Sequence, residues 1–185
     1  IVDTWTSMTN IGFKQDHNAS YAQPGRFNDP DMVVLGKAAW NEPQRNTHLT
    51  PNEQYTHFSL WCLLSAPLLL GCDLSQVDDF THSLLTNTEI LAVNQDELGK
   101  QARTIIDKEP FKVYMKPLAD GSYAVGIFNL SLADAPFTIQ TADLNLSGKY
   151  TFRDLWRQKD VGKGVQYKTN IPLHGVVMLK LTPSK

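Results

Sequence analysis

The sequence predicts an α/β unit followed by an antiparallel β-sandwich, and a change of texture along the chain indicates where one gives way to the other. Residues 1–102 alternate helical and short apolar segments, whereas residues 103–185 carry only strand-like segments separated by turn residues. Short strands at even spacing with turn signals between them are typical of a sandwich. We therefore divide the chain into a first domain, 1–102, and a second domain, 103–185.

The strongest helix signal in the first domain starts at Thr50. Thr50 can cap the helix, Pro51 suits its first turn, and Glu53 can reach back to the Thr50 amide. Aromatic and leucine side chains then fall on one helical face, and Ala66-Pro67 ends the helix. Three more helices are expected: Thr4 to Ile11 ended by Gly12, Ser83 to Asn87, and Glu89 to Gln95 closed by Gly99.

Two short apolar segments are predicted to be strands of a parallel sheet, namely Met32 to Leu35 and Leu68 to Leu70. A strand that is apolar on both faces belongs in a parallel sheet covered by helices. Asp73 follows the second strand, at the carboxyl end where barrel enzymes place active-site groups. Two such strands would leave open edges. Either this part packs differently, or upstream residues are missing, as the start at Ile1 rather than Met also indicates.

The second domain opens with a hairpin signal, in which Lys112 to Leu118 and Tyr123 to Asn129 flank Asp120-Gly121. The aromatic side chains of this domain, Trp156 among them, are interpreted as core rather than as a platform for sugar. Four further strands are expected, at Phe137 to Gln140, Tyr150 to Trp156, Val165 to Thr169 and Val176 to Leu181.

Composition narrows the classes of function. The formal net charge of −2 gives no electrostatic case for a nucleic-acid partner or an anionic membrane surface. No apolar run reaches transmembrane length, since the longest, from Leu60 to Leu70, is interrupted by a serine and a proline. The two cysteines, Cys62 and Cys72, are expected to be buried free thiols. The five histidines are scattered, so no metal site is expected.

The segment from Gly25 to Gly36 is the candidate functional segment. Asn28, Asp29 and Asp31 flank a proline and run directly into the first buried strand. Carboxylates this close to a core need hydrogen-bond partners or ligands, because a desolvated charge is costly. Such clusters often mark a site. An Asp-Pro turn that feeds a core strand explains the same residues, and both readings stay open on these residues alone.

Motifs along nearly the whole chain, in order, resemble the α-galactosidase family of glycoside hydrolases, family 27. Each motif alone would be weak, and their order makes the resemblance specific. They are Gly25 to Gly36 with Asn28-Asp-Pro-Asp-Met32, His57-Phe-Ser-Leu-Trp61, Ala66 to Leu74, Leu85 to Asp96 with Leu98-Gly-Lys100, Asp120-Gly-Ser122, Asp154-Leu-Trp156 and His174-Gly-Val176.

The resemblance implies the last units of a (β/α)8 TIM barrel followed by an antiparallel β-sandwich domain, in a retaining enzyme that removes terminal α-galactosyl residues. Such enzymes use two carboxylates and no metal or organic cofactor. Nothing here matches the family's nucleophile motif, which lies further upstream. The acid/base Asp precedes an Ile-x-Asp-x-Trp motif, matched by Ile1 to Trp5, so it is expected immediately before Ile1. Neither catalytic carboxylate is therefore expected in this chain.

The resemblance also assigns the remaining site residues. Asp31 and Met32 match positions that line the galactose pocket, Asp29 is expected to orient the loop, and Asp3 matches a position near the acid/base group. Asp73 is interpreted as structural. The preference for galactose, N-acetylgalactosamine or arabinose is set earlier in the barrel and stays open, as does the oligomeric state.

Three hypotheses follow about the chain's own role. The first is part of an α-galactosidase with a secreted or periplasmic location, since substrates of this class are usually outside the cytoplasm. The second is a non-catalytic module that binds carbohydrate or serves a structural role. The third, hydrolysis by this chain alone through Asp29, Asp31 or Asp73, is disfavoured, because Asp29 and Asp31 would point apart on an extended segment.

Overall fold

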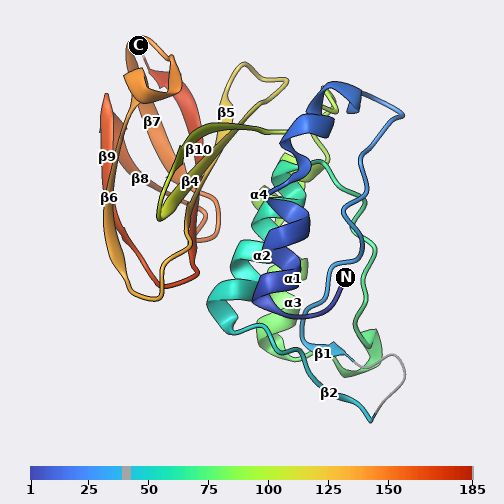
Figure 1. The fold of residues 1–185 in the computed structure, drawn as a ribbon. Helices are drawn as coiled ribbons and strands as arrows, with labels where there is room; N and C mark the ends of the chain where they lie inside the picture. The colour runs from blue at the N-terminus through green and yellow to red at the C-terminus, as the bar shows by residue number, and fades with distance from the viewer. Residues whose placement is uncertain (39–42, 185) are drawn as a thin grey trace.

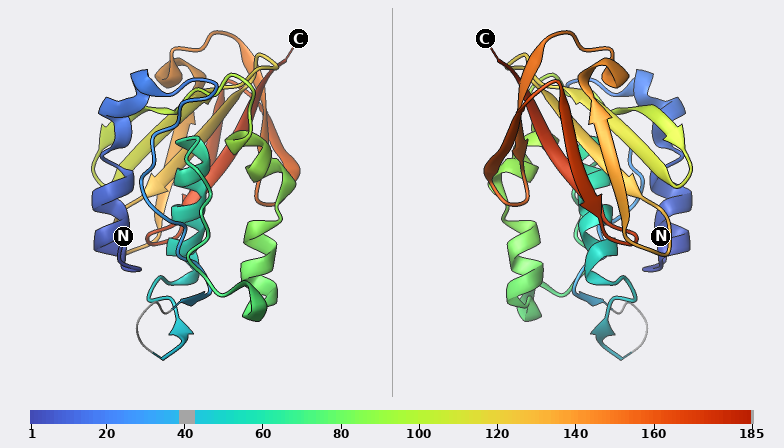
Figure 2. Two further views of the ribbon diagram at one scale, coloured as in Figure 1. Left: turned by 90° about the vertical axis from the view of Figure 1, so that its right-hand side faces the viewer. Right: turned by 90° about the vertical axis from the view of Figure 1, so that its left-hand side faces the viewer.

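The computed structural model describes residues 1–38 and 43–184. A helical part and an antiparallel sandwich lie side by side, and the helix α2 (Pro51–Leu63) lies against the sheet with α1 on one side of it and α3 and α4 on the other (Figures 1 and 2). No helix within the described residues is long and apolar enough to cross a membrane. This arrangement is the α/β unit followed by a β-sandwich that the sequence predicts.

The helical part contains short elements joined by long connections. In chain order they are α1 (Trp5–Gly12), the 3-10 helix η1 (Gln15–Tyr21), the short strands β1 (Lys37–Ala38) and β2 (Arg45–Asn46), α2, the 3-10 helix η2 (Leu74–Gln76), α3 (Asp79–Leu85) and α4 (Thr88–Asn94). The strands β1 and β2 pair antiparallel with each other.

The predicted start of α2 is confirmed. The Thr50 hydroxyl accepts from the Glu53 N–H at 3.4 Å, and the Glu53 carboxylate accepts from the Thr50 N–H at 2.8 Å. The other oxygen of Glu53 also contacts His174 Nδ1 at 2.6 Å, which ties the helix start to the sandwich. The helix ends at Leu63, before the predicted stop, and the chain turns at Ser65 with φ of 53°.

The predicted end of α1 is confirmed, since Gly12 is the last residue of the helix and Phe13 is its C-cap. The helix begins where expected, with Thr4 as its cap. A Cβ atom at Gly12 would lie 2.6 Å from Leu60 Cδ2 and 2.7 Å from Trp61 Cζ3. The glycine therefore also permits α1 and α2 to approach closely at this end of the helix.

The two following helices are present, but their predicted bounds are wrong. The helix α3 begins at Asp79 rather than Ser83, because Asp78 caps it by accepting from the Thr81 N–H at 2.7 Å. Asn87, predicted inside the first helix, instead caps α4. Gly99 has a φ of 58° in a later turn, where its N–H donates to Asp96 O, so it does not close α4.

The predicted parallel pairing of the two apolar strands is confirmed over a short stretch. Val33 N–H donates to Leu69 O and Gly71 N–H to Val33 O, both at 2.8 Å, around a parallel bridge between Val33 and Leu70. The residues 33–35 are fully buried. The expectation that the second strand is buried on both faces is wrong, since Leu69 and Leu70 are 54% and 36% exposed.

The second part is wholly antiparallel among its described strands. One sheet has six strands in the order β3-β4-β5-β10-β7-β8, and the strands β6 and β9 pair separately. The strands are β3 (Arg103–Lys108), β4 (Phe111–Pro117), β5 (Tyr123–Asn129), β6 (Ala135–Gln140), β7 (Lys149–Asp154), β8 (Lys159–Gly164), β9 (Gln166–Ile171) and β10 (Val176–Ser184), with the 3-10 helix η3 (Thr141–Leu144) after β6.

The hairpin prediction is confirmed by β4 and β5, and four more strands lie close to their predicted positions. Sequence reasoning missed β3 and β8. Both are edge strands of the large sheet, and both carry charged, exposed side chains. Such edges resist pairing with other chains and lack a strong apolar pattern.

Two apolar clusters fill the interior. One lies within the sandwich and includes Val113, Val125 and Leu179. The other joins α2 to the opposite face of the sheet, through Tyr114 and Phe128. This second cluster contains residues from both sides of position 102. The division into a first domain, 1–102, and a second domain, 103–185, therefore stays a prediction. Trp156, predicted to be part of the core, packs against this cluster but is only partly buried.

Candidate functional site

The segment that precedes the first buried strand is anchored by Asn28. Its Nδ2 donates to Asn18 O and to Gln101 Oε1, both at 2.7 Å. Gln101 in turn donates to Gln15 O at 2.8 Å. Asn28 therefore fixes the loop to η1 and to the start of the sandwich, and its amide is engaged in structure.

Asp29 and Asp31 are not on an extended segment, contrary to the expectation from their spacing. Asp29 Oδ1 accepts from the Asp31 N–H at 2.8 Å, which closes a tight turn. Asp31 has a φ of 80°, a left-handed conformation that is uncommon for a residue with a side chain. Its carbonyl oxygen accepts from Trp61 Nε1 at 2.7 Å, so α2 holds this backbone in place.

Both oxygens of the Asp31 carboxylate have a partner, and the side chain is still partly exposed. Oδ1 accepts from the Met32 N–H at 2.7 Å, and Oδ2 contacts the amino group of Ile1. These two donors, the Ile1 amino group first, lower the pKa of Asp31. The side chain is 44% exposed, so an ionised carboxylate faces solvent beside the half-buried Met32. Such a group can accept hydrogen bonds from hydroxyls.

Asp3 is a buried carboxylate with a complete set of partners. Arg45 donates to both of its oxygens, at 2.7 and 3.3 Å, and the His48 N–H donates at 3.0 Å. Burial raises the pKa of Asp3, but the hydrogen bonds from Arg45 and His48 outweigh it and lower the pKa to about 2. Asp3 thus fastens the loop between β1 and α2. Neither partner carries a sequence signal that could have identified it.

Asp73 and His57 are also engaged within the fold. Asp73 accepts from the Ser75 hydroxyl at 2.6 Å, from the Ser75 N–H at 2.9 Å and from Gln44 Nε2 at 2.6 Å, and these donors, the hydroxyl first, lower its pKa. His57 is fully buried, and its Nε2 accepts from the Val34 N–H at 3.0 Å. Burial lowers the pKa of His57 to about 3, so the ring is neutral and supports the first strand.

Among the described residues, no group of three His, Cys, Asp or Glu side chains is placed to hold a metal ion. Both cysteines are free, but only Cys62 is buried as predicted. Cys72 is half-buried, because the strand before it is partly exposed. Burial raises the pKa of both thiols, which favours the unreactive protonated form.

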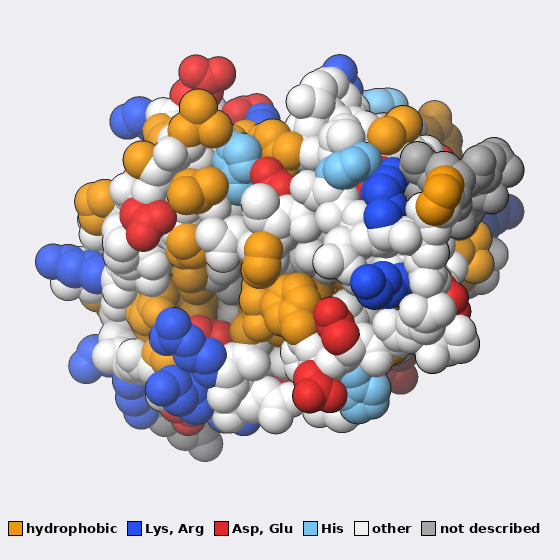
Figure 3. Space-filling view, turned by 90° about the horizontal axis from the view of Figure 1, so that it is seen from below, with side chains coloured by type: hydrophobic (Ala, Val, Ile, Leu, Met, Phe, Trp, Pro, Cys, Tyr) orange, Lys and Arg blue, Asp and Glu red, His pale blue; other side chains and the backbone are white. Residues whose placement is uncertain are grey.

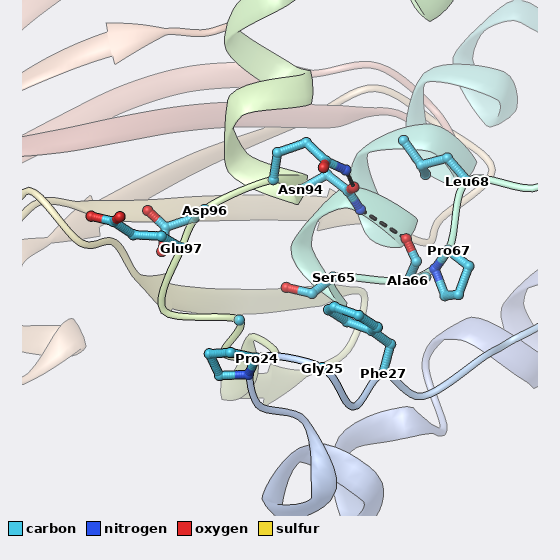
Figure 4. Close-up of a pocket in the computed structure, with 12 residues that line it drawn as sticks. Pro24, Gly25, Phe27, Ser65, Ala66, Pro67, Leu68, Asn94, Asp96 and Glu97 are labelled. Carbon is cyan, nitrogen blue, oxygen red and sulfur yellow. Dashed lines mark hydrogen bonds between the residues drawn. The ribbon is translucent and has the colours of Figure 1, made fainter.

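A pocket of about 430 Å³ lies beside the same loop, but Asp31 and Met32 do not line it. Phe27 closes one side, and Asp96 and Glu97 stand on the other (Figure 4). Asn94 Nδ2 donates to Ala66 O at 2.9 Å within its wall. Asp96 accepts from two backbone N–H groups, so its carboxylate is already occupied. The residues singled out by sequence therefore lie outside this pocket.

Comparison with known proteins gives these positions a context. A family model described as "Alpha galactosidase A" matches residues 1–96, and one described as "Alpha galactosidase C-terminal beta sandwich domain" matches residues 108–181. The chain is 40% identical over 187 residues to an alpha-galactosidase of Cyamopsis tetragonoloba, covering 99% of this chain and 43% of that protein.

Solved structures of similar proteins lead to the same family. The chain is similar to a GH27 β-L-arabinopyranosidase from Geobacillus stearothermophilus, with a TM-score of 0.92 and 28% identity, over 100% of this chain and 43% of that one. It is also similar to alpha-galactosidase I from Mortierella vinacea, with a TM-score of 0.86 and 30% identity, over 96% of this chain and 45% of that one.

The fold and these matches define a fragment of a barrel-plus-sandwich glycosidase. The chain belongs to the α-galactosidase family of glycoside hydrolases, family 27. It spans less than half the length of the relatives that it matches.

Proposed function

We propose that the protein containing this chain is a retaining glycoside hydrolase that removes terminal α-galactosyl residues from oligo- or polysaccharides. The proposal is carried by the Asp31 carboxylate, which is 44% exposed and lies beside the nitrogen of Ile1. The family resemblance places the acid/base carboxylate immediately before Ile1. The two carboxylates would then lie at the same site.

In this mechanism one upstream carboxylate attacks the anomeric carbon, and the other protonates the leaving oxygen and later activates water. The chain's own residues prepare that site. Asp31 accepts hydrogen bonds from sugar hydroxyls, and its negative charge raises the pKa of the neighbouring acid, which must stay protonated to act. Met32 offers an apolar wall, and Asp29 holds the turn that presents Asp31.

The contact between Ile1 and Asp31 does not depend on a free amino group. Where a residue precedes Ile1, the same nitrogen is a peptide N–H, which can still donate to the carboxylate. The missing barrel strands are thus proposed as the partner that completes the site and covers the exposed Leu69 and Leu70.

A terminal arabinopyranoside is a second candidate substrate, besides a terminal α-galactoside. Similarity to a β-L-arabinopyranosidase favours a terminal arabinopyranoside as the second candidate. That sugar shares the ring hydroxyl arrangement of galactose but lacks its hydroxymethyl group, so Asp31 could bind either. We also propose a secreted or periplasmic location, because polymeric substrates of this class lie outside the cytoplasm.

The test uses the full-length protein with nitrophenyl α-galactoside and nitrophenyl β-L-arabinopyranoside. We expect hydrolysis of the first, and an NMR time course that shows the α-anomer of galactose forming first. Asp31→Asn should lower kcat/KM by about 100-fold or more, as expected for a lost charged hydrogen bond at the reacting sugar. Asp73→Asn keeps its helix cap and serves as the matched control. Failure to hydrolyse any terminal α-galactoside would refute the proposal.

A further inference from the structure

A second pocket, of about 310 Å³, lies between the start of α2 and the sandwich. Its walls include Tyr55 from α2, Trp156 from the loop after β7 and Tyr167 from β9. Seen from the end of the molecule where α2 begins, the surface carries a hollow between sandwich and helices, bordered by hydrophobic side chains with Lys and Arg side chains nearby (Figure 3). Asp31 does not line this pocket.

The three aromatic side chains are fixed by packing and are only partly buried. Trp156 donates its indole N–H to Ser59 Oγ at 2.9 Å, and the Tyr55 ring meets it edge-on, with ring centroids 4.7 Å apart. The Tyr167 ring stacks on Phe152, with centroids 5.7 Å apart. Rigid aromatic groups that keep an exposed portion bind ligands at low conformational cost.

Hydrogen-bond donors and hydrogen-bond acceptors both lie beside these rings. Asp154 accepts from the Arg157 N–H at 2.9 Å, and the Arg157 Nε lies 3.6 Å from its other oxygen. The two charges offset each other, so the pocket offers acceptors and donors without favouring a charged ligand. Within the described residues, the Asn170 amide and the hydroxyls of Tyr55 and Tyr167 make no side-chain hydrogen bond, which leaves them available.

We propose that this pocket binds one neutral pyranose ring of an oligosaccharide, at a site separate from Asp31. The apolar face of the ring lies on the aromatic side chains, and its hydroxyls pair with Asp154, Arg157 and Asn170. Hydroxyls both donate and accept, which matches this mixture of groups. The volume suits a small ligand. The choice of a galactoside as the first probe rests on the proposed function.

The experiment follows the Trp156 indole signal in ¹H–¹⁵N spectra of the full-length protein during titration with methyl β-D-galactoside. The variant Trp156→Phe identifies the Trp156 signal among the indole signals of the full-length protein. We expect a saturable shift with a Kd on the order of 1 mM, as is typical for a ligand of this size. Galacturonate, which is charged, should bind at least fivefold more weakly.

Two lining residues are changed to test the site, each with a control of the same residue type. Asn170→Ala and Tyr167→Ala should weaken binding at least fivefold, while the exposed Asn10→Ala and Tyr21→Ala leave it unchanged. Tyr167 also packs on Phe152, so Tyr167→Ala can misfold. In that case the binding measured for Asn170→Ala decides the test, because Asn170 is exposed. A Trp156 signal that does not move, or moves equally in Asn170→Ala, overturns the proposal.

Hydrolysis separates this proposal from the proposed function. Asn170→Ala should hydrolyse nitrophenyl α-galactoside at the wild-type rate, since the residue lies outside the Asp31 site. A saturable Trp156 shift without any hydrolysis would overturn only the proposed function. Hydrolysis without the shift would overturn only the second site.

Discussion

Lys116 provides a measurable test of the interface between the helices and the sandwich. It lies on β4, its side chain is fully buried, and its Nζ donates to Val93 O at 2.6 Å and to the Ser65 hydroxyl. It thus binds the last turn of α4 and the turn after α2. Burial lowers the pKa of Lys116 from 10.5 to about 8, although the Asp96 carboxylate and the Cys62 thiol act to raise it.

The lowered pKa predicts how stability depends on pH. A shift from 10.5 to about 8 corresponds to roughly 3 kcal/mol, at about 1.4 kcal/mol per pKa unit. The unfolded chain keeps this proton up to about pH 10.5, whereas the folded chain loses it near pH 8. The cost of burying the charge is therefore present in full below pH 8 and disappears as the pH rises towards 10.5.

We expect the free energy of unfolding of the wild type, relative to Lys116→Met, to rise by about 2–3 kcal/mol between pH 7 and pH 10. The variant loses the buried charge but leaves the Val93 carbonyl without its donor, a cost of about 1–3 kcal/mol. At pH 7 these terms nearly cancel, and at pH 10 the variant is the less stable. Urea unfolding across this pH range measures the difference.

The matched control is Lys112→Met, on the same strand with its ammonium partly open to solvent. Its stability should run parallel to that of the wild type across the range. A stability difference for Lys116→Met that stays constant between pH 7 and pH 10 would show that the lysine keeps its proton in the folded chain. The reasoning from burial would then be wrong.

Three further predictions concern other positions. Gly12→Ala should lower the free energy of unfolding by about 1–3 kcal/mol, because its methyl group would overlap the facing helix, and a melting temperature equal to the wild type's would argue against that packing. The Asp3 pKa of about 2, below its usual 3.8, contributes roughly 2 kcal/mol to the free energy of unfolding above pH 4, and this contribution is lost as the pH falls towards 2. In an acid titration, the free energy of unfolding should therefore fall more for the wild type than for Asp3→Asn. Asn129-Leu-Ser and Asn145-Leu-Ser are acceptor sequences for N-glycosylation; in a glycosylating host, peptide mass spectrometry should find a glycan at the exposed Asn145 and none at Asn129, whose buried amide donates to three carbonyls.

The elements that the sequence predicts well are those decided by local chemistry. Thr50 and Glu53 specify the start of α2 between them, and Asp120-Gly121 specifies the turn between β4 and β5. The elements that it predicts poorly depend on distant partners. Gly12 is predicted as the end of a helix, but its close packing on Leu60 is not, because only the fold reveals which surface a glycine faces.

The candidate site divides in the same way. The Asn/Asp cluster and the family motifs locate Asp29, Asp31 and Met32, but not the shape of the turn. Asp31 has a positive φ, and its carbonyl oxygen accepts a hydrogen bond from Trp61, thirty positions along the chain. The partners of Asp3 are equally remote, and nothing in the sequence around Arg45 indicates that it pairs with Asp3.

The geometry of Asp31 links the sandwich to the site. A left-handed residue with a side chain costs about 1–3 kcal/mol and persists only where its surroundings enforce it. Here the Trp61 indole enforces it from α2, and α2 is held by the sheet, where Gly126 on β5 lets Leu63 pack flush against the strand. A Cβ atom at Gly126 would lie 2.5 Å from Leu63 Cδ1. The sandwich therefore sets the position of α2, and through Trp61 the position of the carboxylate that we propose to bind the sugar.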